Sequence, residues 1–415
     1  MSDAASGPLS DVRVLDLTRL LPGGFCSLLL ADFGADVVKV EDTRMGDYVR
    51  WAPPYYGSEE QQPLGTRSAL YLALNRGKRS IRLDLKSEGG REAFLRLARD
   101  YDVVLESFRP GVLDKLGCGY EALRKANPRI VYCAITGYGQ TGPNKQRAGH
   151  DMNYLGLNGL LALTGEPGGR PIQSAGQIAD LGGGALMAAF GVMAALRERE
   201  RSDEGQLVDV SMTDGSLAWL AMVAAQYLCD GVVPERGRGS LNGGIACYLP
   251  YEASDGWVTC GALEPKFWRN FCEGVGRSDL VDKQFAAPDS DDGQAIAAVF
   301  RERTRDQWKA FNDEHDAMIE PILDLGEALD SDLIREREMV VEMEQPQLGP
   351  VRLLGLPVKL SRTGGDVTRP APALGEHTEQ VLADAGFPAE EVSSLLESGA
   401  ASGPNEQAEP ARFMG

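Results

Sequence analysis

The sequence is poor in the residues that commonly hold proteins together through disulfides or metals. It has seven cysteines and three histidines in 415 residues. The cysteines are scattered, odd in number and form no CxxC pair. That pattern argues against a disulfide framework or a structural zinc site and indicates free thiols in a reducing compartment. No stretch of about 18 uncharged apolar residues is present, so no membrane-spanning helix is expected.

The N-terminus also lacks a basic segment followed by an apolar run, so we expect no signal peptide and a cytoplasmic location. Basic charge is in deficit: 42 Lys and Arg face 61 Asp and Glu, a formal net charge of −19. Such a protein repels nucleic acid and anionic membranes, so neither is expected as a partner. A polyanionic ligand would therefore need a local basic pocket.

The first third of the chain alternates apolar strand patterns with helical ones. Strands are expected at 12–17, 36–41, 79–85, 102–106 and 130–136. Strands separated by helical stretches predict a mostly parallel sheet with crossover helices. Right-handed crossovers place the carboxyl ends of such strands at one rim, where ligands usually bind. The predicted fold class is α/β.

Changes in composition predict the domain organisation. The N-terminal part of the large domain is expected to span 1–225, followed by a Gly- and Arg-rich linker at 226–244. Shorter strands and charged helices at 245–333 indicate a smaller α+β domain. Residues 334–398 are interpreted as a linker that returns to the large domain. The Ser-, Gly- and Pro-rich tail at 399–415 is expected to be flexible.

Two residues are candidates for chemistry. Asp180 precedes three glycines and an apolar helical stretch, which places it at or beside a helix N-terminus. It could simply cap that helix, but glycines there would also let a ligand approach the backbone, whose amides can hold an oxyanion. His150 belongs to the residue type whose ordinary pKa of about 6.5 lies near neutral pH. His150 could instead have no catalytic role and be a loop histidine that makes ordinary backbone hydrogen bonds.

Several motifs in order along the chain resemble the family III coenzyme A transferases (the CaiB/BaiF superfamily). They run from about residue 9 to 385 and read LSDVRVLDLTRLLPGGFCSLLLADFGADVVKVE, LNRGKRSIRLDL, SFRPGVLDKLGCGYEAL, RIVYCAITGYGQTGP, ADLGGGALMAAFGV and PAPALGEHTEQVL. The resemblance implies an interlocked homodimer in which each chain has a large Rossmann-like and a smaller domain. It also implies an acyl-CoA substrate and no separate cofactor.

One segment resembles the α-methylacyl-CoA racemase branch. AGHDMNYLGLNGLLALTG contains a His-Asp pair, and the transferases usually lack this histidine. The resemblance implies that His150 and Asp180 exchange protons with the substrate on opposite faces. Asp151 would fix the imidazole tautomer. Glu264, in GALEPKFW, resembles an active-site glutamate that the partner subunit would contribute. Asp151 and Glu264 could instead be a cap or a surface charge.

Coenzyme A needs cations for its phosphates. By resemblance, Lys39, the Asn75–Arg76 loop and Arg109 are the expected contacts, and Tyr154 is expected to line the same pocket. Any single basic residue among these could equally be a solvated side chain, and Tyr154 a core aromatic.

Three functions remain open from the sequence. The first is epimerisation of 2-methylacyl-CoA thioesters, an isomerase activity of lipid metabolism, with the acyl chain unidentified. The second is CoA transfer, with Asp180 as the nucleophile that forms an acyl anhydride. The third is non-catalytic acyl-CoA binding. His150 favours the first, because a transferase has no use for a base on the opposite face.

Overall fold

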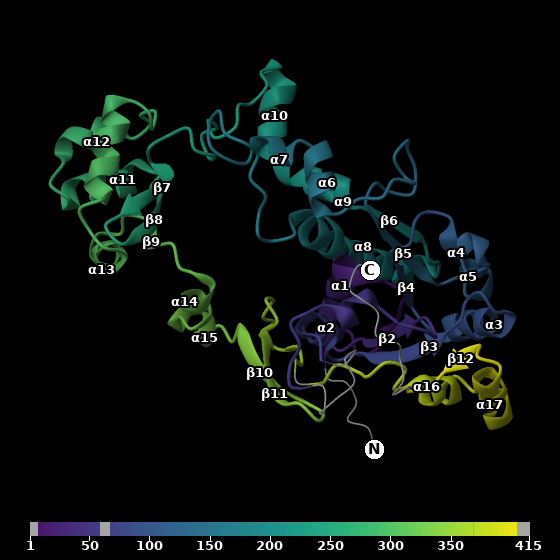
Figure 1. Ribbon diagram of the computed structural model, residues 1–415. Helices are drawn as coiled ribbons and strands as arrows, with labels where there is room; N and C mark the ends of the chain where they lie inside the picture. Colours follow the sequence, from purple (N-terminus) through teal and green to yellow (C-terminus); the bar gives the residue numbers. More distant parts are fainter. Residues whose placement is uncertain (1–6, 59–66, 368, 405–415) are drawn as a thin grey trace. The chain divides into compact units, whose positions relative to one another are not determined.

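The computed structural model describes residues 7–58, 67–367 and 369–404. The chain divides into two compact units (Figure 1). The first consists of 1–158, 176–219 and 333–415, and the second consists of 159–175 and 220–332.

A seven-stranded sheet forms the centre of the first unit, in the order β12-β3-β2-β1-β4-β5-β6. All neighbours from β3 to β6 are parallel, and β12 is antiparallel to β3. The strand order reverses at β1, which pairs with β2 on one side and β4 on the other. Ligands bind at such a switch point in open α/β sheets, outside the carboxyl ends of the strands. The strands are β1 (Arg13–Asp16), β2 (Asp36–Glu41), β3 (Arg79–Leu83), β4 (Val103–Glu106), β5 (Val131–Thr136), β6 (Leu207–Ser211) and β12 (Ala401–Ser402).

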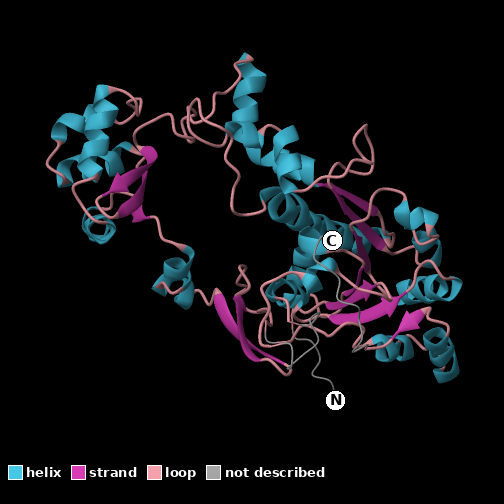
Figure 2. Ribbon diagram, in the orientation of Figure 1, coloured by secondary structure: helices cyan, strands magenta, loops and turns pink. Residues whose placement is uncertain are grey.

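Helices flank this sheet, as Figure 2 shows. The inner strands are apolar and buried on both faces, which is the burial pattern of parallel sheets covered by crossover helices. The helices of this unit are α1 (Leu20–Asp32), α2 (Ala69–Asn75), α3 (Glu88–Leu97), α4 (Val112–Lys115), α5 (Tyr120–Ala126), α6 (Asp151–Leu157), α8 (Met187–Ser202), α9 (Met212–Leu217), α16 (Thr378–Asp384) and α17 (Ala389–Glu397). An antiparallel hairpin, β10 (Val340–Gln345) and β11 (Gly349–Leu354), completes it.

A wide π-helical segment, Ile178–Leu186, leads directly into α8. Together these residues are long and apolar enough to cross a bilayer by length and composition. They contact α1, β5 and β6, which is the position of a helix packed on the sheet of a globular domain.

The second unit is built on an antiparallel sheet of β7 (Tyr248–Ala253), β8 (Gly256–Gly261) and β9 (Ile319–Pro321). Its core is aromatic: the ring of Phe300 stacks on Tyr251 and Phe271 at centroid distances of 4.1 and 5.0 Å. The helices are α7 (Leu160–Leu163), α10 (Ala221–Asp230), α11 (Pro265–Gly274), α12 (Asp291–Phe300), α13 (Arg305–His315) and α14 (Leu325–Leu329), and α15 (Asp332–Glu336) begins the return to the first unit.

Helix starts follow local capping rules. The side chains of Ser87, Ser290 and Thr304 precede α3, α12 and α13, and each accepts a hydrogen bond from the backbone N–H three residues later. Such a bond satisfies one of the N–H groups that a helix leaves unpaired at its start.

The predicted α/β class with a mostly parallel sheet is confirmed, and all five predicted strands are present with bounds that differ by at most two residues. The units are bounded differently from the predicted domains, since 159–175 groups with the second unit and the divisions fall after 219 and 332. The tail predicted to be flexible from 399 is ordered at its start, because β12 pairs with β3. The interlocked homodimer stays a prediction.

Candidate active site

A cavity of about 520 Å³ opens in the first unit at the carboxyl ends of β1, β4 and β5. It therefore lies at the switch point of the sheet. Its lining brings together His150, Asp180, Arg109 and Tyr154 from the predicted site. The full lining is Arg19, Leu20, Pro22, Tyr48, Ser107, Phe108, Arg109, Pro110, Ile135, Thr136, Gly137, Tyr138, Lys145, Arg147, Ala148, Gly149, His150, Tyr154, Asp180 and Met212.

His150 is the residue before α6 and has an exposed side chain at the cavity. The helix start fixes its backbone, because the side-chain oxygen of Asn153 accepts a hydrogen bond from the His150 backbone N–H at 2.9 Å. This is half of a capping box, the arrangement in which the third residue of a helix bonds back to the cap. The imidazole therefore projects from a fixed point at the cavity wall.

Asp151 connects the start of α6 to the segment that carries Asp180. Its carboxylate is buried, and its Oδ1 accepts hydrogen bonds from the backbone N–H groups of Ala179 and Asp180 at 2.7 and 3.0 Å. The other oxygen, Oδ2, is buried without a hydrogen-bond partner in the described part of the chain. This corrects the expectation that Asp151 fixes the tautomer of His150. The carboxylate instead caps the π-helical segment, whose first N–H groups are otherwise unpaired.

The environment of Asp180 favours its protonated form. Burial, and secondly the charge of Asp151, raise the pKa of Asp180 from 3.8 to about 7. A carboxyl group with that pKa both gives and takes a proton at neutral pH, which suits general acid–base catalysis.

The three glycines after Asp180 have a different role from the one expected. They are buried, and a Cβ at Gly183 would lie 2.7 Å from the carbonyl oxygen of Met212 and from the N–H nitrogen of Ser216. A Cβ at Gly182 would similarly meet the ring of Trp219. The glycines therefore let the π-helical segment pack closely on α9 and the turn after it, rather than giving a ligand access to the backbone.

Tyr154 shapes the turn that ends at His150. Its ring is buried, and its hydroxyl donates a hydrogen bond to the carbonyl oxygen of Gly149. The Tyr154 ring also meets Tyr138 edge-on at a centroid distance of 5.2 Å. Burial raises the pKa of Tyr154 above its ordinary value, so the hydroxyl remains a donor at neutral pH. As predicted, this residue lines the cavity, and it also supports the backbone beside His150.

The cavity is basic although the protein is strongly acidic. Besides Arg109, its lining includes Arg19, Lys145 and Arg147, which sequence reasoning missed. Lys145 and Arg147 lie in the loop PNKQRAGH after β5, where two basic residues just before His150 were the available signal. This is the local basic pocket that a polyanionic ligand requires.

Lys39, Asn75 and Arg76 do not reach the cavity, which corrects their expected contact with coenzyme A. All three are buried and bonded inside the protein. The ammonium of Lys39 lies 2.8 Å from the Asp47 carboxylate, and the guanidinium of Arg76 lies 2.6 Å from that of Asp32. The amide oxygen of Asn75 accepts a hydrogen bond from the ammonium of Lys78 at 2.9 Å. Buried polar groups need such partners, so these side chains serve the fold.

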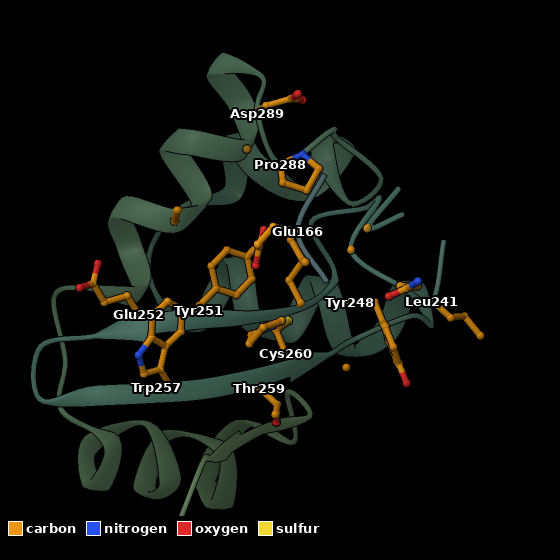
Figure 3. Close-up of a pocket in the computed structure, with 18 of the residues that line it drawn as sticks. Glu166, Leu241, Tyr248, Tyr251, Glu252, Trp257, Thr259, Cys260, Pro288 and Asp289 are labelled. Atoms are coloured by element: carbon orange, nitrogen blue, oxygen red, sulfur yellow. The ribbon is translucent and has the colours of Figure 1, made fainter. Parts of the chain in front are cut away.

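Glu264 lies in the second unit, where it immediately precedes α11. Its predicted contact with the site of a partner subunit stays a prediction. The second unit also has a larger cavity of about 1260 Å³, partly lined by Tyr248, Tyr251 and Trp257 (Figure 3). None of the predicted site residues lines it. The smaller cavity, which gathers four of them, is the candidate active site.

Comparisons with known proteins identify the family of the chain. The family model described as CoA-transferase family III matches residues 9–378. The succinyl-CoA:mesaconate CoA-transferase of Haloarcula hispanica is 36% identical over 92% of this chain and 97% of its own length. The human alpha-methylacyl-CoA racemase is 36% identical over 93% of this chain and 96% of its own.

A crystal structure of a CAIB/BAIF family protein from Brucella suis superposes with a TM-score of 0.79 at 32% identity, and covers 92% of this chain and 100% of that protein. Because the identity is equal for a transferase and a racemase, the choice between the two reactions depends on the site. The extent of these matches confirms the resemblance seen in the motifs, and the chain belongs to CoA-transferase family III.

Proposed function

We propose that this protein is a racemase of 2-methylacyl-CoA thioesters that uses His150 and Asp180 as its two acid–base groups. The observation that carries the proposal is that both side chains line one cavity and come from different elements, the start of α6 and the π-helical segment. Two separately held groups are what proton transfer on two faces of one carbon requires.

The chemistry follows from the weak acidity of the α-proton of a thioester. In one direction the neutral imidazole of His150 takes the α-proton, and the electron pair of the broken C–H bond forms an enolate. Protonated Asp180 then gives its proton to the opposite face of the α-carbon, which inverts the centre. For the other epimer the roles exchange. The enolate is an anion, and the basic lining of the cavity favours it.

CoA transfer is the second candidate, favoured by the identity to the succinyl-CoA:mesaconate enzyme. There, ionised Asp180 would attack the thioester carbonyl, form an acyl anhydride and release the CoA thiolate. The raised pKa of Asp180, about 7, fits proton transfer better, because a nucleophile must be ionised whereas an acid–base group must change its protonation state.

The deciding experiment incubates one epimer of 2-methylbutyryl-CoA in deuterated water. Racemisation predicts deuterium at the α-carbon and conversion to the other epimer. The conversion should be lost in both H150A and D180A, whereas each variant should still exchange the α-proton of the epimer that faces its remaining group. A parallel reaction of succinyl-CoA with a free dicarboxylic acid tests transfer. Thioester exchange without deuterium incorporation, lost in D180A but retained in H150A, would establish the transferase instead. Binding of CoA with neither reaction would indicate a non-catalytic protein.

We also propose that the protein works as a homodimer in which a second copy contributes Glu264. Exposed apolar side chains support this: Leu186, Phe190 and Met193 share one face across the start of α8, and Phe190 is 74% exposed. A mixed dimer of H150A and E264A chains would then contain one intact site. Activity that reappears when the two inactive variants are refolded together supports the shared site, whereas a monomer in sedimentation equilibrium contradicts it.

A further inference from the structure

Glu106 is a buried carboxyl group that the proposed proton transfer does not use. It ends β4 and is 3% exposed. Its Oε2 accepts a hydrogen bond from the backbone N–H of Phe108 at 2.7 Å, and its carboxylate is also hydrogen-bonded to the hydroxyl of Tyr132 on β5. An ionisable side chain at this depth is costly to bury unless such bonds hold it.

The residues that follow Glu106 form a turn in the cavity wall. Ser107, Phe108, Arg109 and Pro110 all line the cavity. The Phe108 N–H that Glu106 binds lies inside this turn, so the carboxylate fixes the direction in which the chain leaves β4. The cavity face of the turn therefore depends on a side chain that is itself outside the cavity lining.

Two further hydrogen bonds join this turn to other parts of the cavity wall. The hydroxyl of Ser107 accepts from the backbone N–H of Arg19 at 3.1 Å, which joins the turn to the segment after β1. The carbonyl oxygen of Pro110 accepts from the side-chain amide of Gln146 at 2.8 Å, which joins it to the loop that ends at His150. The turn thus connects two other segments that carry cavity residues, and together the three segments hold all four basic residues of the lining.

The geometry points to Glu106 as a positioning residue for ligand binding: through the Phe108 N–H it holds the 107–110 turn, and with it Arg109, in the arrangement that binds the CoA portion of the substrate. This needs the family-level expectation of an acyl-CoA ligand and not the proposed racemisation. Charged-group acceptors make stronger hydrogen bonds than neutral ones, but either one satisfies the N–H.

The test compares E106A with E106Q, because glutamine keeps an oxygen that can accept from Phe108 and alanine does not. We expect E106A to weaken CoA binding about tenfold in isothermal titration calorimetry. We expect it to raise the KM for acyl-CoA by a similar factor while kcat changes less than twofold. E106Q should stay within twofold of the wild type in both quantities. The matched control is Y132F, which removes the other hydrogen bond of Glu106 and should leave KM unchanged.

A merely structural role makes a different prediction. If Glu106 only stabilised the fold, E106A would have a lower midpoint of thermal unfolding. The loss of folded protein would reduce the number of binding sites, but the affinity of the remaining sites for CoA would not change. Affinity for CoA unchanged in folded E106A, or E106Q as impaired as E106A, overturns the proposal. If E106A does not fold, S107A replaces it as the test, because it removes the hydrogen bond between the turn and Arg19. We then expect S107A to raise the KM for acyl-CoA by at least threefold. An unchanged KM in S107A overturns the proposal. Calorimetry with CoA alone keeps this result separate from the outcome of the deuterium experiment.

Discussion

Replacing Asp151 with asparagine isolates the effect of one charge on Asp180. The substitution removes the negative charge but leaves an amide oxygen able to accept from the N–H groups of Ala179 and Asp180. The pKa of Asp180 is raised from 3.8 to about 7, with burial as the larger cause and the Asp151 charge as the smaller. Asp151 therefore accounts for less than half of the rise. D151N should lower the pKa of Asp180 by about one unit, a tenfold change in the ratio of ionised to protonated carboxyl.

A background that lacks His150 makes this shift measurable. In H150A, Asp180 is the remaining member of the pair, and it removes the α-proton only when it is ionised. Release of tritium from the α-carbon of one 2-methylbutyryl-CoA epimer should therefore rise with pH to a plateau, with a midpoint near 7. In H150A/D151N the midpoint should lie at lower pH than in H150A, because the Asp151 charge that raises the pKa of Asp180 is absent. A single titrating group avoids the shared titration of a coupled acid–base pair.

The matched control is D282N, which makes the same charge change at an exposed position of the second unit and should leave the midpoint unchanged. If the midpoint of H150A/D151N stays near 7, the Asp151 charge does not set the proton affinity of Asp180. If it rises, the sign of the interaction is wrong. Either result refutes the reasoning.

The remaining predictions concern stability and ligand binding. The pKa of Glu106 is raised from 4.5 to about 7 by burial, so the folded state holds a proton that the unfolded chain releases, and stability falls as pH rises through this range. The free energy of unfolding, measured in urea, should therefore be higher for E106Q than for the wild type by an amount that grows between pH 4.5 and 8 to about 3 kcal/mol. A difference that does not change with pH contradicts this. R147M should raise the KM for acyl-CoA about tenfold at low salt and less at high salt, whereas a salt-independent effect argues against a phosphate contact. K39M leaves Asp47 buried without its cation and should cost about 3–5 kcal/mol in urea unfolding. A stable K39M with weakened CoA binding would restore the original expectation for Lys39.

The strands of the sheet and the position of Asp180 beside a helical stretch were predictable because their signals are local. Strand β5 is buried on both faces and therefore reads as a nearly continuous apolar run bounded by turns. Asp180 was correctly expected near a helix start because glycines and an apolar helical stretch follow it directly. These features depend on neighbouring residues in the chain, which a single sequence contains.

The corrected residues depend on partners far away in the sequence. A lysine at a strand end has the same local pattern whether it meets a phosphate or a buried carboxylate, and only the fold brings Asp32 to Arg76 across 44 positions. The carboxylate of Asp151 likewise reaches 28 residues ahead, and nothing adjacent to it indicates that it caps the Asp180 segment rather than orienting His150.

Asp180 would be needed for either candidate reaction, but each reaction requires a different protonation state. With a pKa near 7 both protonation states of Asp180 are populated at pH 7, and loss of the Asp151 charge would shift it toward the ionised form. The first state serves a group that must both give and take a proton, and the second serves a nucleophile. Asp151 therefore favours the same reaction as His150, although it touches only backbone N–H groups. If the protein is a transferase, D151N should preserve or increase the rate of thioester exchange at neutral pH. If it is a racemase, D151N should slow the direction in which Asp180 donates the proton.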